Sequence, residues 1–186
     1  MGSVPNPKWP FGLSHNRSRT QRISKVALLA DTWLRHGSTP SAGWARQENI
    51  NDLPIATAMA GVDFRLSPYA YRELHWHRAN EWSLMLAGSV RISAVNDYGE
   101  TTFNDLMAGD VWFFPSGIPH SIQTLEAGCE FLLVFDQGNF DESGTFLASE
   151  LFERMPREVL AKNFRTDVSS FEGLPDGQLY IFPGKS

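Results

Sequence analysis

The chain has 186 residues, of which 42% are hydrophobic and 20% are charged, a composition typical of one soluble globular domain. No apolar run approaches the ~18 residues that cross a bilayer, so we expect no association with a membrane. Residues 1–42 hold six of the 16 Lys and Arg residues but one of the 21 Asp and Glu residues, so residues 43–186 carry a net charge of −10. An acidic body of this kind does not attract nucleic acid.

Residues 1–42 are predicted to form an N-terminal arm and a basic insertion. The arm is rich in proline and therefore extended, and in a small β-barrel protein such an arm lies across a neighbouring subunit, so we expect a homo-oligomer. Basic residues beside an apolar patch could form a membrane-surface or partner site, but the insertion has no sustained 3.6-residue period, which favours a flexible segment. No secretory signal is recognisable, so the cytoplasm and secretion after processing both stay open.

From Gly43 onward the pattern is that of a β protein, and we interpret residues 43–186 as a single domain. Glycine and other turn-forming residues separate short runs of strand-forming residues, with Gly88 expected in one turn and residues 96–99 in a hairpin. The clearest runs are residues 56–66, 82–87, 90–95, 111–114 and 131–135. Strands this short and evenly spaced predict a sandwich or a closed barrel.

Two motifs carry metal-binding side chains. The first is His75-Trp-His77-x3-Glu81-x6-Gly88, and the second is Gly109-x5-Pro115-x-Gly117-x2-His120. Alternate side chains share a face of a strand, so His75 and His77 enter the same cavity, and Glu81 keeps the same phase. The second motif ends in a rigid corner that delivers His120 from a separate strand.

A single histidine on an apolar strand is usually a core residue with its hydrogen bonds satisfied. Three imidazoles and one carboxylate buried together carry a heavy desolvation cost, which coordination of a divalent metal offsets. We therefore predict a metal site inside a jelly-roll barrel, whose interior can collect ligands from strands that are not adjacent. The single cysteine, Cys129, is expected to be a small buried core residue.

Near the end of the chain, residues 156–163 begin with proline and continue with a Val-Leu stripe. Proline is favoured at the start of a helix because its missing N–H is not needed there. The sequence therefore predicts a short C-terminal helix packed on the barrel.

These motifs resemble those of the cupin superfamily, whose fold is an all-β double-stranded β-helix, or jelly-roll barrel. Further segments resemble the N-terminal cupin domain of the oxalate decarboxylases. They are Arg72-Glu-Leu-His-Trp-His77, Phe114-Pro-Ser-Gly-Ile-Pro-His-Ser-Ile-Gln123, Glu130-Phe-Leu-Leu-Val-Phe-Asp136 and residues 156–164. The resemblance covers about residues 43–183. It implies a carboxy-lyase that cleaves oxalate to formate and carbon dioxide, with Mn²⁺ and dioxygen as cofactors.

The resemblance also implies roles for particular residues. The metal ligands fall on His75, His77, Glu81 and His120. The catalytic arginine falls on Arg72, whose odd spacing from His75 turns it away from the ligand face of a regular strand, so we expect a local bulge; the alternative is a surface salt bridge. The flexible lid falls on residues 141–144, where Glu142 is the expected proton donor.

Two departures from the family pattern keep other functions open. The lid reads Asp-Glu-Ser-Gly rather than Ser-Glu-Asn-Ser, which leaves an oxalate oxidase that releases hydrogen peroxide as an alternative. Tyr69 stands where the family has a glycine, which predicts an altered cavity entrance, and oxalate decarboxylases usually contain two cupin domains. These two features keep a third function open, that of a metal-binding cupin without catalytic activity.

Overall fold

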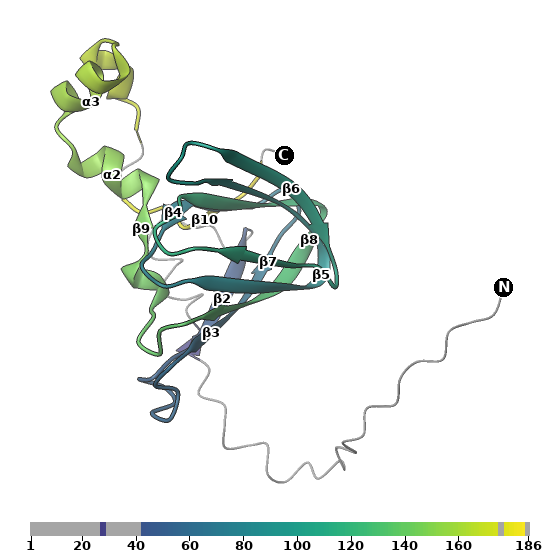
Figure 1. Cartoon of the computed structure of the whole chain (residues 1–186). Coiled ribbons are helices and arrows are strands. Elements are labelled where there is room, and N and C mark those ends of the chain that lie inside the picture. The colour runs from purple at the N-terminus through teal and green to yellow at the C-terminus, as the bar shows by residue number, and fades with distance from the viewer. Residues whose placement is uncertain (1–26, 29–41, 175–176, 185–186) are drawn as a thin grey trace, which may run out of the picture.

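The computed structural model describes residues 27–28, 42–174 and 177–184 (Figure 1). The strands are β1 (Ala27–Leu28), β2 (Gly43–Glu48), β3 (Ala60–Leu66), β4 (Tyr71–Trp76), β5 (Glu81–Val95), β6 (Thr101–Met107), β7 (Val111–Phe114), β8 (His120–Phe135), β9 (Phe146–Leu147) and β10 (Ile181–Phe182). The helices are η3 (Glu142–Gly144), α2 (Ala148–Arg154), α3 (Arg157–Phe164) and η4 (Val168–Phe171). The predicted arm and insertion fall outside the described residues, apart from Ala42 and β1, which pairs with β2.

The strands form one antiparallel sheet that curls on itself (Figure 1). Its main path runs β1-β2-β3-β8-β4-β10, while β5 pairs with β6, β7 and β8. Strand β8 occupies the centre, because its first part pairs with β4 and its last part with β3, and both parts pair with β5. The prediction of an all-β jelly-roll barrel with a short C-terminal helix is confirmed.

Aromatic and aliphatic side chains fill the interior of the barrel. Phe64 on β3 and Phe131 on β8 stack with their ring centroids 5.3 Å apart. The other largest fully buried apolar side chains of this core are Phe135, Met85, Ile122, Ile181 and Val62. Strand β6 lacks this inward alternation, since nearly all of its residues are exposed, and it therefore adds a hairpin to the barrel rather than core volume.

Gly88 lies within β5 and not in a turn, so that prediction is wrong. Strand β5 continues through it for 15 residues, and its register with β8 shifts on both sides of Gly88. Gly88 has φ 74°, and a Cβ atom there would lie 2.0 Å from the carbonyl oxygen of Gly128 on β8. Glycine is required here because the two strands approach too closely for any side chain, and both strands can bend at this point.

The C-terminal helix exists, but it does not pack on the barrel as predicted. The buried side chains of α3, Leu160 and Ala161, form a separate small cluster with Phe171 of η4. Figure 1 shows α3 standing away from the sheet, connected to it through α2 and β9. Among the described residues, no helix is long and apolar enough to span a membrane.

Tyr69 also departs from expectation. It adopts a left-handed conformation with φ 60°, the kind of backbone that favours glycine, so its place in the motif does demand unusual geometry. Its side chain is 45% exposed and does not line the cavity beside the metal ligands described below. The predicted change at the cavity entrance is therefore wrong.

We predict that Gly88→Ala destabilises the fold far more than Gly99→Ala. Both glycines have positive φ, but a Cβ at Gly99 meets nothing within 4 Å. Gly99→Ala should lower the free energy of unfolding by about 1–2 kcal/mol, the cost of the left-handed backbone. Gly88→Ala should cost roughly 1–3 kcal/mol more because of the clash with Gly128. Urea denaturation of both variants measures the difference, and equal losses would contradict the close approach of β5 and β8.

Candidate metal centre

The four residues of the two motifs come together in one place. His75 lies on β4, His77 directly follows that strand, Glu81 begins β5 and His120 begins β8. Their possible ligand atoms all lie within 4.8 Å of one another, and the residues are between 0% and 7% exposed. The structure thus gathers the full predicted set.

Strand geometry explains this convergence. His75 and His77 reach the same cluster, while Trp76 between them packs on Phe146, with ring centroids 4.8 Å apart. Direct pairing of His75 with His120 places the second motif beside the first. Glu81 pairs with Phe135 at the far end of β8, which folds back toward its own beginning.

Each imidazole is oriented by a backbone carbonyl oxygen that its Nδ1 contacts. The distances are 2.6 Å from His75 to Glu73, 2.8 Å from His77 to Ala79 and 2.7 Å from His120 to Ile118. A carbonyl oxygen only accepts hydrogen bonds, so each Nδ1 carries the hydrogen and each Nε2 keeps its lone pair. This is the outer support that metal-binding histidines typically have.

The donors fit a divalent cation. His120 Nε2 is buried without a hydrogen-bond partner among the described residues. Glu81 Oε2 lies 3.1 Å from His77 Nε2 and 3.6 Å from His120 Nε2. With the imidazoles neutral, these contacts bring lone pairs against a carboxylate, so the cluster needs a proton or a cation at its centre. Three nitrogens and one carboxylate oxygen suit manganese and other first-row metals, with coordination positions left open.

The titration of the cluster agrees with this assignment. Burial, helped by the charge of Arg72, lowers the pKa of His75 well below 6.5, which keeps the imidazole neutral. Burial alone would raise the pKa of Glu81, but its close contacts with the imidazoles of His120 and His77 outweigh it and lower the pKa to about 2. Glu81 is therefore an anionic ligand at neutral pH. Burial lowers the pKa of His77, but its contact with Glu81 prevails and raises it, so a metal ion competes with a proton there.

Arg72 lies near the metal donors, close enough for its charge to act on His75, and the bulge that its spacing required is present. Arg72 pairs with Ile122 and His75 pairs with His120, so β4 has one more residue than β8 between the two pairs. The extra residue rotates Arg72 inward. Its side chain is 1% exposed, which contradicts the alternative of a surface salt bridge.

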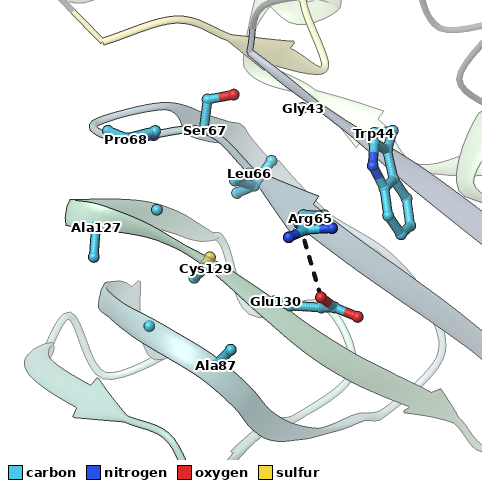
Figure 2. A pocket seen from close by; sticks show the side chains of 12 residues that line it. Gly43, Trp44, Arg65, Leu66, Ser67, Pro68, Ala87, Ala127, Cys129 and Glu130 are labelled. Atoms are coloured by element: carbon cyan, nitrogen blue, oxygen red, sulfur yellow. Dashed lines mark ion pairs between the residues drawn. The ribbon is translucent and has the colours of Figure 1, made fainter.

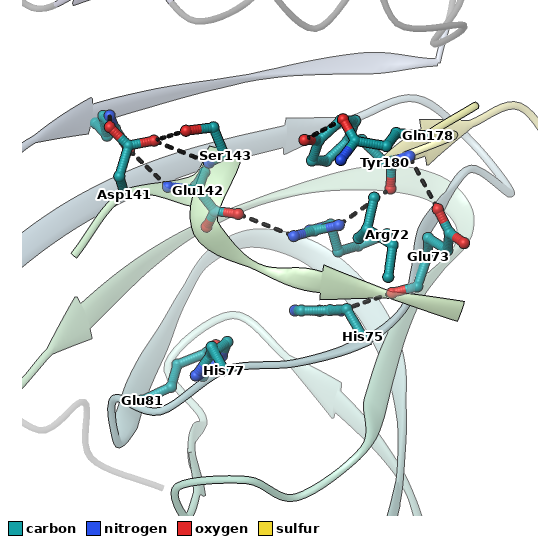
Figure 3. Close-up of polar contacts among 12 residues, drawn as sticks. Arg72, Glu73, His75, His77, Glu81, Asp141, Glu142, Ser143, Gln178 and Tyr180 are labelled. Atoms are coloured by element: carbon teal, nitrogen blue, oxygen red, sulfur yellow. Dashed lines mark hydrogen bonds and ion pairs between the residues drawn. The ribbon is translucent and has the colours of Figure 1, made fainter. Parts of the chain in front are cut away.

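Glu142 lies opposite Arg72. Its Oε2 accepts a hydrogen bond of 2.9 Å from Arg72 Nη2, and the carboxylate is 2% exposed (Figure 3). Glu142 begins helix η3, which the side chain of Asp141 caps by accepting from Ser143 N. Burial raises the pKa of Glu142, and the charge of Arg72 opposes the rise only in part. The predicted lid residue thus sits beside the predicted arginine, with a carboxyl group that holds a proton more readily than usual.

Two neighbours of Arg72 were missed by sequence reasoning. Tyr180 accepts a 3.4 Å hydrogen bond from Arg72 Nη1 through its carbonyl oxygen. The carboxylate of Glu73 accepts from the backbone N–H groups of Ser149, at 2.7 Å, and Tyr180, at 3.1 Å. These contacts join segments that lie more than 70 residues apart in the sequence, so the spacing of residues within one strand or turn cannot predict them.

A cavity of about 570 Å³ opens beside the cluster, between His77 and the segment that carries Glu142. Its other lining residues include Arg78, Ser116, Asn139 and Phe140. Of the four metal donors, His77 lines this cavity.

A second cavity, of about 450 Å³, lies at the bends of β5 and β8, away from the strand ends that hold the metal ligands (Figure 2). Arg65 and Glu130 approach each other there at 3.8 Å. Burial raises the pKa of Cys129 to about 12, so this thiol is a poor nucleophile, as expected for a core residue.

The sequence and the fold identify the family of the chain. A model of the cupin family matches residues 35–170. The chain belongs to the cupin family. It is 41% identical to oxalate decarboxylase of Bacillus subtilis (strain 168) over 97% of its own residues, but it spans only 42% of that enzyme.

Solved oxalate decarboxylases share this fold. A Bacillus subtilis structure from a study of the Mn(II) centres of that enzyme gives a TM-score of 0.77 and 43% identity over 81% of this chain and 40% of the other. The formate complex of the Lactobacillus farciminis enzyme gives a TM-score of 0.77 and 45% identity over 81% of this chain and 44% of the other. The chain therefore spans less than half the length of these relatives.

We predict that Glu81→Gln weakens Mn²⁺ binding by more than ~100-fold, because even residues that only support metal ligands contribute ~10–100-fold. The matched control is Glu130→Gln, which removes the charge of a partly exposed carboxylate beside Arg65 and should leave Mn²⁺ affinity unchanged. Titration with Mn²⁺, with free ion followed by electron paramagnetic resonance, measures both. Wild-type affinity in Glu81→Gln would remove this carboxylate from the metal site.

Proposed function

We propose that the chain is a manganese-dependent oxalate decarboxylase that converts oxalate and a proton to formate and carbon dioxide, with dioxygen required but not consumed. The observation that carries the proposal is the buried Arg72–Glu142 pair close to the four metal donors. An anion-binding guanidinium and a protonatable carboxyl group are the two functions that this reaction asks of the protein. The named relatives support the same assignment.

Residues His75, His77, Glu81 and His120 would hold Mn²⁺. The ion supplies a Lewis acid for an oxalate oxygen and, with dioxygen, the one-electron oxidation that weakens the carbon–carbon bond. The buried setting strengthens each electrostatic contact, since water is largely excluded.

Arg72 would bind and orient the substrate. A planar guanidinium holds a carboxylate through paired N–H donors, which a lysine cannot reproduce. Arg72 already engages Glu142, so an oxalate carboxylate at this position must share the guanidinium or displace Glu142. Either way Glu142 stays beside the bound anion.

Glu142 would transfer the proton. After carbon dioxide departs, the remaining one-carbon unit regains the electron that the oxidation removed and needs one proton, and a carboxyl group with a raised pKa is suited to supply it. Glu142 then takes a proton from solvent before the next turnover. Because Glu142 is 2% exposed, the transfer would take place with bulk water largely excluded from the carboxyl group.

An oxalate oxidase stays the alternative, since the lid sequence Asp-Glu-Ser-Gly departs from the family pattern at residues 141–144. The same metal site would then yield two molecules of carbon dioxide and hydrogen peroxide. A non-catalytic metal-binding cupin is the third possibility, because fold does not fix function.

Products formed from oxalate by the Mn²⁺-loaded chain decide among these functions. We predict formate as the main product under air, no net uptake of dioxygen, and no turnover under nitrogen. Formate is measured with a formate dehydrogenase and peroxide with a peroxidase. Peroxide in place of formate would establish the oxidase, and neither product would establish a non-catalytic cupin.

We predict that Glu142→Gln lowers the rate of formate production by at least ~100-fold, because the amide keeps the size of the side chain but cannot donate or take the proton. Bound Mn²⁺ should stay unchanged. The control is Glu158→Gln on α3, which removes an exposed carboxyl group far from the cavity. Unaltered formate production in Glu142→Gln would assign the proton step to another group.

The homo-oligomer stays a prediction that light scattering after gel filtration will measure. The compartment, cytoplasmic or extracellular, stays open as well. No nucleic-acid partner is proposed for this acidic chain.

A further inference from the structure

Gln47, on strand β2, is a buried side chain that the function proposed above leaves without a role. It is 5% exposed, and the two polar atoms of its amide group form hydrogen bonds with two consecutive residues of the lid, residues 141–144. Its Nε2 donates to Asp141 Oδ2 at 3.0 Å, and its Oε1 accepts from Glu142 N at 3.0 Å. The donor and acceptor pattern fixes the orientation of the amide, because a carboxylate faces one end and an N–H group faces the other.

Strand β2 and the residues after it form hydrogen bonds with the segment that leads to Glu142, residues 138–141. Asn49 donates to the carbonyl oxygen of Phe140 at 3.0 Å, and Ile50 N donates to that of Gly138 at 2.8 Å. Gln47 is the last of these attachments along the lid segment. It is also the one that contacts the backbone of Glu142 itself.

Glu142 is therefore held at two points of different kinds. Arg72 binds its carboxylate, and Gln47 binds its backbone N–H group. An anionic substrate competes with Glu142 for the cationic Arg72. It gains no such charge attraction by displacing the neutral amide of Gln47 from a backbone N–H group. When the substrate takes Arg72, the contact with Gln47 is the one that persists.

Building on the proposed decarboxylase, we infer that Gln47 is a positioning residue that keeps Glu142 over the substrate during turnover and so favours formate over peroxide. If the lid opens before the proton is delivered, the one-carbon unit that remains after the first carbon dioxide departs gives up one further electron. Oxalate has then lost two electrons to dioxygen, and the products are two molecules of carbon dioxide and hydrogen peroxide. Gln47 opposes that opening because opening breaks both hydrogen bonds of its amide at once and deprives the buried N–H group of Glu142 of its acceptor.

The test uses a charge change and its reversal in the Mn²⁺-loaded chain. Gln47→Glu places a carboxylate against Asp141 at about the 3.0 Å of the present contact, and like charges repel at this distance. Asp141→Asn in the same variant restores a donor–acceptor pair with its direction reversed. Gln47→Ala removes the contact without adding charge, and Gln123→Glu on β8 is the matched control away from the cavity.

Hydrogen exchange of the backbone amides of residues 140–145 reports the lid without reference to activity. Gln47→Glu and Gln47→Ala should exchange there about 5–10-fold faster, the effect of one lost hydrogen bond, while Gln123→Glu exchanges at the parental rate. The formate-to-peroxide ratio should fall by about fivefold in Gln47→Glu and recover to within about twofold in Gln47→Glu/Asp141→Asn, with bound Mn²⁺ constant throughout.

Several results would overturn the inference: parental lid exchange in both single variants, a double variant no better than Gln47→Glu, or slower turnover with an unchanged product ratio. If Gln47→Glu does not fold, Gln47→Ala decides by the same two measurements. A parent chain that makes neither product overturns the proposed function and with it the effect on products, while lid exchange still decides whether Gln47 holds Glu142.

Discussion

One extra residue in β4 determines how the site is organised. Without the bulge between Arg72 and His75, strand alternation would place the guanidinium on the opposite face from the imidazole. With it, the guanidinium lies on the same side as the metal donors, next to Glu142. The contact of Glu142 with Arg72 follows from that rotation. The same bulge contains Glu73, whose backbone oxygen orients His75 and whose carboxylate ties down two distant segments.

The buried ion pair is a poor choice for stability alone. Arg72 and Glu142 are 1% and 2% exposed, and removing two charges from water costs several kcal/mol per ion, which their attraction often fails to offset. Apolar side chains of the same volume would serve the barrel as well or better. The pair makes sense when a third charged species visits the cavity, because the guanidinium then has a second anion to bind and the carboxylate has a proton to exchange.

The parts of the fold that follow local periodicity were predictable from the sequence. Strand alternation placed His75 and His77 together, and the odd spacing of Arg72 announced the bulge. Gly88 was misread because a glycine with positive φ serves equally well in a turn and at a bend within one strand. The hydrogen bonds of Gln47 with Asp141 and Glu142 could not be predicted, because these partners lie 94 and 95 residues away and local sequence patterns do not report contacts at that separation. The proline and the Val-Leu stripe predicted the helix α3, but they could not predict that its apolar side would pack on Phe171 of η4 and not on the barrel.

Tyr180 has a consequence for how the molecule is assembled as it is synthesised. This residue supplies the carbonyl oxygen that Arg72 contacts, and its ring lies 5.7 Å from the guanidinium. The last metal donor, His120, leaves the ribosome about sixty residues earlier. All four candidate metal donors therefore precede, in the order of synthesis, the residue that completes the surroundings of the arginine, so the anion-binding half of the site depends on the last part of the chain and the metal-binding half does not.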